Sequence, residues 1–142
     1  MSLPPVSELT VRVNYSEVDQ MGVVYHARYI VWLDMARTEH LRRAGISYRE
    51  VEESGYRLAV GELMARYRQP ARYDDLIRIR CWVRDVASRR VTFGYAVESE
   101  DGARLLATAW TAMLVLDSRM TLARLPDSLK AILIPVPDPV RL

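Results

Sequence analysis

Residues 15–45 have the sequence YSEVDQMGVVYHARYIVWLDMARTEHLRRAG, a polar loop that ends at Gly22 and is followed by a long helical segment. We expect the helix to begin at His26 or Ala27 and to end at Ala44, before a glycine that can stop it. Its first half is apolar on nearly every side. A helix of that kind is enclosed by other elements, so the segment predicts a buried helix entered through a polar loop.

The residues around this segment predict a sheet. A capping box at Ser47-Tyr48-Arg49-Glu50 opens a second, short helix that ends near Gly55, and beyond residue 56 the apolar period changes from 3.6 to 2. Glu100-Asp101-Gly102 is a hairpin signal. The expected strands cover residues 10–15, 58–68, 77–84, 91–97 and 105–116. This order predicts an α+β fold in which an antiparallel sheet of about five strands curls around one helix.

Length and composition narrow the class of protein. The chain has 142 residues, half of them hydrophobic, and a net charge of +2, which is typical of one globular domain and not of a disordered chain. We expect a single domain over residues 1–142, with an extended proline-rich tail at about 134–142. No apolar run is long enough for a membrane span, and Met1–Pro5 lacks the pattern of a signal peptide. Cys81 is the only cysteine, so the expected location is the cytoplasm.

The basic residues are almost all arginine: of 20, only Lys130 is lysine. Biased codon usage explains such a composition as well as phosphate binding does. Because 18 acidic residues are interspersed with the basic ones, no basic block marks a surface for nucleic acid, and no nucleic-acid partner is expected.

The segment Tyr15–His26, followed by Tyr29 and by Ala36-Arg37-Thr38-Glu39, resembles the hotdog-fold acyl-CoA thioesterases, most closely the 4-hydroxybenzoyl-CoA thioesterase group and the thioesterases associated with the Tol-Pal system. A weaker echo is Gln69-Pro70-Ala71-Arg72-Tyr73-Asp74-Asp75. The resemblance covers residues 10–120. It implies a hotdog fold and hydrolysis of an acyl-CoA to a free acid and CoA, with no metal or other cofactor.

Asp19 is the central candidate for catalysis. Thioester hydrolysis needs a base or nucleophile near the carbonyl, and backbone N–H groups at a helix N-terminus can hold the charge that develops on its oxygen. Asp19 precedes the predicted helix, so both parts can meet there. An aspartate in this setting is also an ordinary turn or capping residue. The resemblance assigns the catalytic role to Asp19.

Further site residues follow from the resemblance. His26 is expected to orient the carboxylate or water, or to offer its backbone N–H to the thioester oxygen; it can also satisfy a helix end. Tyr15 is expected to bond near Asp19, although a strand tyrosine serves equally well in packing. The expected substrate-binding residues are Gly22, Val23, Val24 and Tyr25 along the loop, with Arg89 and Arg90 for the CoA phosphates; Arg66 and Arg68 are further candidates for the phosphates.

Other ionisable residues receive structural interpretations. Asp34 is expected to pair with Arg37, although it can instead reach a polar group on the acyl moiety. Glu39 is expected to form an ion pair, His40 to be solvated, and Cys81 to be a small buried strand residue. The spacing of histidines and cysteine predicts no zinc site.

Three questions stay open at the level of sequence. The resemblance implies a homodimer or homotetramer with active sites at the subunit interface, and an unpaired sheet edge gives a physical reason for it. A non-catalytic module that binds acyl-CoA is one alternative function, and an enoyl hydratase or dehydratase of the same fold is another. The acyl group and the choice between CoA and acyl carrier protein are not determined.

Overall fold

The computed structural model describes residues 5–142; residues 1–4, which belong to the segment without a signal-peptide pattern, lie outside it. Within residues 5–142, three α-helices, one 3-10 turn and five strands follow one another. They are β1 (Ser7–Arg12), η1 (Tyr15–Glu17), α1 (Arg28–Ala44), α2 (Tyr48–Glu53), β2 (Tyr56–Tyr67), β3 (Leu76–Val86), β4 (Arg90–Ser99), β5 (Leu105–Asp117) and α3 (Asp127–Lys130). Within the described chain, no helix is long and apolar enough to cross a membrane.

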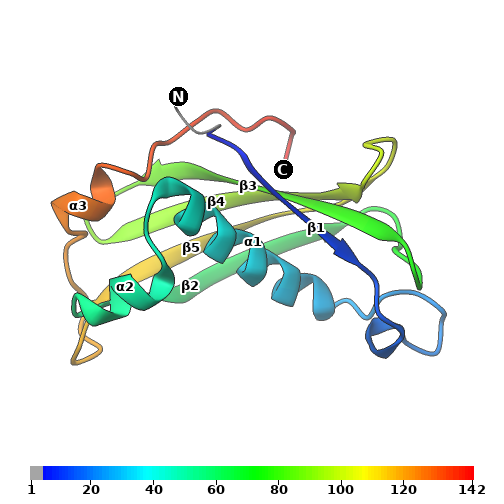
Figure 1. Cartoon of the computed structure of the whole chain (residues 1–142), viewed down its shortest axis with the longest axis horizontal. Helices are drawn as coiled ribbons and strands as arrows, with labels where there is room; N and C mark the ends of the chain where they lie inside the picture. The colour runs from blue at the N-terminus through cyan, green and yellow to red at the C-terminus, as the bar shows by residue number, and fades with distance from the viewer. Residues whose placement is uncertain (1–4) are drawn as a thin grey trace.

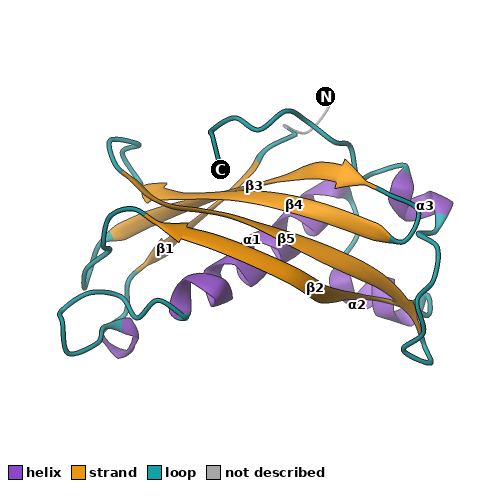
Figure 2. Ribbon diagram, turned by 180° about the vertical axis from the view of Figure 1, so that it is seen from behind, coloured by secondary structure: helices purple, strands orange, loops and turns teal. Residues whose placement is uncertain are grey.

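The five strands form one antiparallel sheet in the order β1-β3-β4-β5-β2. Helix α1 lies across one face of the sheet, with β1 crossing beside it (Figure 1). Seen from behind, the strands curve over the helix (Figure 2). The predicted α+β order is confirmed, and so is the position of β5, which is apolar on both faces and lies between two other strands.

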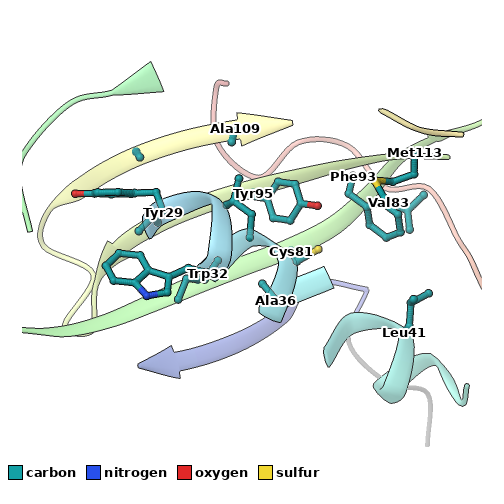
Figure 3. Packing of buried hydrophobic residues seen from close by; sticks show 14 of the residues in the cluster. Tyr29, Trp32, Ala36, Leu41, Cys81, Val83, Phe93, Tyr95, Ala109 and Met113 are labelled. Atoms are coloured by element: carbon teal, nitrogen blue, oxygen red, sulfur yellow. The ribbon is translucent and has the colours of Figure 1, made fainter. Parts of the chain in front are cut away.

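The core fills the space between α1 and the concave face of the sheet. Tyr29, Trp32 and Ala36 on α1 belong to the same buried cluster as the strand residues Cys81 and Tyr95 (Figure 3). Burial of each large side chain stabilises the fold by about 1.5–3 kcal/mol. The packing of α1 against the sheet therefore fixes the position of the helix N-terminus relative to the strands. The loop before the helix is thereby held at one end of the sheet, beside the last residues of β2.

The first strand differs from its prediction. It covers Ser7–Arg12 and not residues 10–15, because the chain leaves the sheet after Arg12. The Val13 N–H donates to the carbonyl of Asp75, and Asn14 caps η1 in a capping box with Glu17. Tyr15 consequently lies in a 3-10 turn, with 76% of its surface exposed, and the expectation that it is a strand residue is wrong.

The opposite face of the sheet is partly covered by the C-terminal tail. Pro135 forms an isolated parallel bridge with Val83, and the carboxylate of Asp138 accepts hydrogen bonds from Trp82 Nε1 at 2.9 Å and from Arg84. The tail contains no helix or strand, as its prolines predict. This contact explains why Trp82 is fully buried although its neighbours Arg78 and Arg80 in the alternating pattern are not.

Candidate active site

The loop between η1 and α1 is a tight, hydrogen-bonded turn. Val18 and Val24 form an antiparallel bridge, and the Asp19 N–H donates to the carbonyl of Val23 at 2.9 Å. The Gly22 N–H donates back to the carbonyl of Asp19 at 3.0 Å, with Gly22 at a φ of 78°. This backbone conformation favours glycine, so the residue expected to allow close approach of substrate also closes the turn that carries Asp19.

Glu17 anchors this turn to the helix. Its carboxylate is almost completely buried and accepts hydrogen bonds from the backbone N–H of Asn14 at 2.8 Å and from Trp32 Nε1 at 3.1 Å, and it forms an ion pair with Arg28 at 3.4 Å. Its backbone carbonyl accepts from the N–H of Tyr25. Both ends of the loop and the first turns of α1 therefore meet at one buried side chain.

Asp19 is partly exposed at the tip of the turn. One carboxylate oxygen, Oδ1, accepts a hydrogen bond from the N–H of Met21 at 2.8 Å, which fixes the side-chain direction. Within residues 5–142 this is the sole hydrogen bond of the carboxylate, so its second oxygen remains open to a ligand or water.

His26 lies two residues before α1 begins. Its ring is exposed, packs on Tyr25 at a centroid distance of 4.6 Å and faces the edge of the Tyr67 ring. Its backbone carbonyl accepts a hydrogen bond from the Tyr67 hydroxyl at 2.8 Å. Among the described residues, its backbone N–H has no acceptor, and Ala27 caps the helix without a side-chain bond. The His26 N–H just before the helix is thus a free donor of the kind that an oxyanion site requires.

A hollow of about 320 Å³ brings together several of the predicted residues. It is lined by Asp19, Met21, Val23, Val24, His26, Tyr29, Tyr67, Arg68, Gln69 and Pro70. The Tyr29 hydroxyl accepts a hydrogen bond from the N–H of Ala71, and burial raises the pKa of Tyr29. Burial also raises the pKa of Tyr67, so both tyrosines stay protonated at neutral pH. The hollow is mostly apolar, with a carboxylate and a histidine at its edge.

Other predicted site residues lie elsewhere. Tyr15 and Gly22 line a second hollow, which also includes Asp19. Tyr25 is exposed and lines neither hollow, and its contact is with the His26 ring.

Arg89 and Arg90 lie at the opposite end of the sheet. Arg90 pairs with Leu114, whereas Tyr67 at the hollow pairs with Ala107 on the same strand. Seven residues of β5 separate those pairing positions, a distance of about 24 Å at 3.4 Å per residue. The arginine that does line the hollow is Arg68.

The structural interpretations of the remaining polar residues are mostly confirmed. Arg37 pairs with Asp34 and donates to the Tyr95 hydroxyl at 3.2 Å, and Glu39 pairs with Arg42 and Arg43. Cys81 is fully buried, and burial raises the pKa of its thiol, so it is not a nucleophile.

The expectation that His40 is solvated is wrong. Its ring is buried, and Nδ1 hydrogen-bonds to the Ser7 hydroxyl at 2.6 Å. It also packs edge-on against Phe93. Ser7, which covers the His40 ring, lies on β1. The position of β1 relative to α1 depends on how the strands pair in the sheet.

Sequence reasoning missed two contributors to the site. Glu17 belongs to the polar loop before the helix, but no neighbouring residue in the sequence predicts that its side chain is buried. Tyr67 reads as an ordinary strand residue, and its contact with His26 depends on how β2 and α1 pack. Arg68 is one of the arginines predicted for the CoA phosphates, and Gln69-Pro70 belongs to the second echo of the motif.

A curved five-stranded antiparallel sheet packed around one long helix defines a hotdog fold, and the Asp19 carboxylate lies in the loop before that helix. Residues 13–133 match the Thioesterase-like superfamily, and the chain belongs to that family. The expected hotdog fold and family are confirmed.

Individual relatives agree with this assignment. The chain is 29% identical to the acyl-CoA thioester hydrolase YbgC of Escherichia coli over 121 residues, 85% of this chain and 90% of the relative. The crystal structure of protein TT1821 from Thermus thermophilus superposes with a TM-score of 0.85 at 38% identity, over 89% of this chain and 96% of that one. A DHNA-CoA thioesterase from Staphylococcus aureus superposes with a TM-score of 0.83 at 27% identity, over 89% and 87% of the two chains.

Proposed function

We propose that this protein is an acyl-CoA thioesterase that hydrolyses a CoA thioester to a free carboxylic acid and CoA. The observation that carries the proposal is the meeting of Asp19 and His26 at one hollow, where the backbone N–H of His26 lacks an acceptor among residues 5–142. The match to the thioesterase family and the activity named for its relatives support the same reaction.

In this mechanism the thioester carbonyl lies with its oxygen toward the His26 N–H at the start of α1. The partial positive charge of the helix N-terminus stabilises the oxyanion that forms. Asp19 either removes a proton from the attacking water or attacks the carbonyl carbon itself, in which case water hydrolyses the resulting anhydride. The C–S bond breaks, and the thiolate of CoA leaves and takes up a proton.

The His26 ring and Tyr15 are assigned supporting roles. The exposed ring of His26 lies at the edge of the same hollow as Asp19, where it can orient the water or the carboxylate. Tyr15 lines the neighbouring hollow with Asp19 and Gly22, which supports a contact with substrate near the carboxylate. Val23 and Val24 line the first hollow, and Tyr25 packs on the His26 ring.

We further propose that the active enzyme is a homodimer or a homotetramer. Among the strands of residues 5–142, β2 forms one edge of the sheet and is hydrogen-bonded to β5. Ile30, Val31 and Met35 on α1 are apolar and partly exposed. An open sheet edge and exposed apolar residues each favour association with a second copy. Arg89 and Arg90, distant from the hollow of their own chain, can contribute to CoA binding only through another copy.

The proposed location is the cytoplasm. The chain has a single cysteine, and its thiol is buried, so it has no disulfide chemistry of the kind that marks oxidising compartments.

The experiment that tests the function is release of free thiol from a panel of acyl-CoAs that includes short, long and benzoyl esters. Turnover of at least one class is the expected result, and it would also identify the acyl group. Tight binding of these esters without turnover would indicate an acyl-CoA-binding module instead. Addition of water to an enoyl-CoA would indicate a hydratase.

A further inference from the structure

Two consecutive peptide groups flank the α-carbon of His26, and a hydrogen bond holds each of them. In the first, the Tyr25 carbonyl accepts from the N–H of Arg28 at 2.9 Å. In the second, the His26 carbonyl accepts from the hydroxyl of Tyr67 at 2.8 Å. Because a peptide group is planar, the carbonyl of Tyr25 and the N–H of His26 turn together. These two bonds therefore restrain the direction in which the His26 N–H points.

The second of these bonds comes from the sheet. Tyr67 is the last residue of β2 and pairs with Ala107 on β5. The next N–H along the chain, that of Arg68, donates to the carbonyl of Leu106 at 2.8 Å, so the backbone of Tyr67 is held on both sides. The bond from Arg28 lies within the same turn as His26. Tyr67 thus ties the backbone just before α1 to the strands.

The donor group of Tyr67 is oriented by its neighbours. Its ring lies edge to face with the Tyr29 ring, at a centroid distance of 5.1 Å, and with the His26 ring at 6.3 Å. Tyr29 is itself fixed, because its side chain is buried and its hydroxyl accepts from the N–H of Ala71 at 3.2 Å. Burial raises the pKa of Tyr67, so the hydroxyl keeps its proton at neutral pH and donates it to the carbonyl.

Such an arrangement matters for a donor that has to meet a developing charge. Donors aimed in advance need no reorganisation at the moment of reaction, and a small displacement of a reacting group lowers the rate strongly. Without the Tyr67 hydroxyl, the peptide group after His26 is free to turn. The partial negative charge of the His26 carbonyl also loses its donor, close to the N–H that the proposed mechanism assigns to the oxyanion.

We propose that Tyr67 is a positioning residue for the thioester hydrolysis: by holding the His26 carbonyl, its hydroxyl directs the His26 N–H at the thioester oxygen. This inference rests on the proposed function, because it takes that N–H as the oxyanion donor. Tyr67 exchanges no proton with the substrate. Its effect is confined to the step in which negative charge develops on the oxygen, and binding of the substrate before reaction changes little.

The kinetic test uses Tyr67→Phe, which keeps the ring and removes the hydroxyl. We expect the single-turnover rate of thiol release from the best acyl-CoA to fall about tenfold, with KM within about twofold of the wild type. Tyr48→Phe is the matched control, since the Tyr48 hydroxyl also donates to a backbone carbonyl, that of Leu58 at 3.2 Å. Tyr48 lines neither of the hollows that include Asp19, and its variant should keep the wild-type rate.

A spectroscopic readout separates positioning from a merely structural role. The probe is a ketone analogue of the same acyl-CoA, in which a methylene group separates an isotope-labelled carbonyl carbon from the sulfur, so that it binds without hydrolysis. A hydrogen bond to the carbonyl oxygen moves the NMR resonance of that carbon downfield. We expect a downfield shift on binding to the wild type and to Tyr48→Phe, and a smaller shift in Tyr67→Phe, whose unfolding midpoint in urea stays close to that of the wild type.

An unchanged single-turnover rate in Tyr67→Phe would overturn the assignment. A slower rate with the full carbonyl shift would also overturn it, because the hydroxyl would then act elsewhere, and a change confined to KM would indicate a direct contact with substrate instead. An equal loss in Tyr48→Phe would count against a specific role for Tyr67. A wild-type protein that hydrolyses none of the esters in the panel is a separate result, and it would count against the proposed function itself.

Discussion

At the scale of single residues, Glu17 does more for the site than its place in the sequence suggests. It is a buried carboxylate whose donors come from the chain before η1 and from α1, so it fixes the loop that presents Asp19. The motif around Asp19 identifies this residue as a candidate for catalysis. No sequence pattern predicts the burial of Glu17, because that burial depends on Trp32, fifteen residues further along the chain.

Replacement of Glu17 by alanine is expected to lower the free energy of unfolding by about 1–3 kcal/mol, because Trp32 Nε1 and the Asn14 N–H lose their buried acceptor. Urea unfolding measures this. Glu39→Ala is the matched control, since its ion pairs with Arg42 and Arg43 are largely exposed and contribute less than about 1 kcal/mol. Equal losses in the two variants would show that Glu17 is not an anchor.

His40 is expected to make the stability depend on pH. Burial lowers its pKa, Arg43 acts in the same direction, and the backbone of Cys81 opposes them. The unfolded chain, with a histidine pKa of about 6.5, binds a proton before the folded chain does, so stability falls as the pH drops below about 6.5. Urea unfolding between pH 5 and 7.5 should show this decline, and His40→Gln should reduce it. An undiminished slope in the variant would assign the pH dependence to other groups.

At the scale of the elements, the apolar periods predicted five strands and a long helix but not where β1 ends. Alternation continues through residues 13–15, yet a capping box formed by Asn14 and Glu17 turns the chain away. The wrong expectation for His40 has a related cause. His40 lies among polar residues in the second half of α1, and only the pairing of β1 with β3 brings Ser7 against its ring. Local patterns cannot encode such contacts between distant segments.

The contact between β3 and β4 on the outer face of the sheet has little tolerance for added volume. A Cβ at residue 94 would lie 2.5 Å from Cε2 of the buried Trp82 indole. Gly94→Ala should therefore lower the free energy of unfolding by about 1–3 kcal/mol. In a double-mutant cycle with Trp82→Leu, the combined loss should be smaller than the sum of the single losses. Strict additivity would show that the indole is not the obstacle.

At the scale of the whole molecule, the proposed assembly would bring a second chain to the site. The sequence located Asp19 and His26, which share a hollow, but it also nominated Arg89 and Arg90, which lie at the far end of the sheet. One sequence cannot show which residues a second copy brings to the site, because that depends on the geometry of assembly.

The protein is expected to sediment as a dimer or tetramer of its 16.3 kDa chain. Met35→Arg should shift it toward the monomer, because a charge would then be placed within the exposed apolar residues of α1. Sedimentation velocity at micromolar concentration measures both. A wild-type protein that is monomeric throughout would contradict the proposed assembly.

The central claim is that the carboxylate of Asp19 takes part in the chemical step, and the most direct measurement compares free-thiol release by the wild-type protein and by Asp19→Asn on the best acyl-CoA of the panel. We expect the variant to lose about a hundredfold or more in kcat, because asparagine neither accepts a proton nor attacks the carbonyl. Asp127→Asn, an exposed aspartate in α3, serves as the matched control and should match the wild type. An Asp19→Asn variant that stays within a few-fold of the wild-type rate would contradict the account.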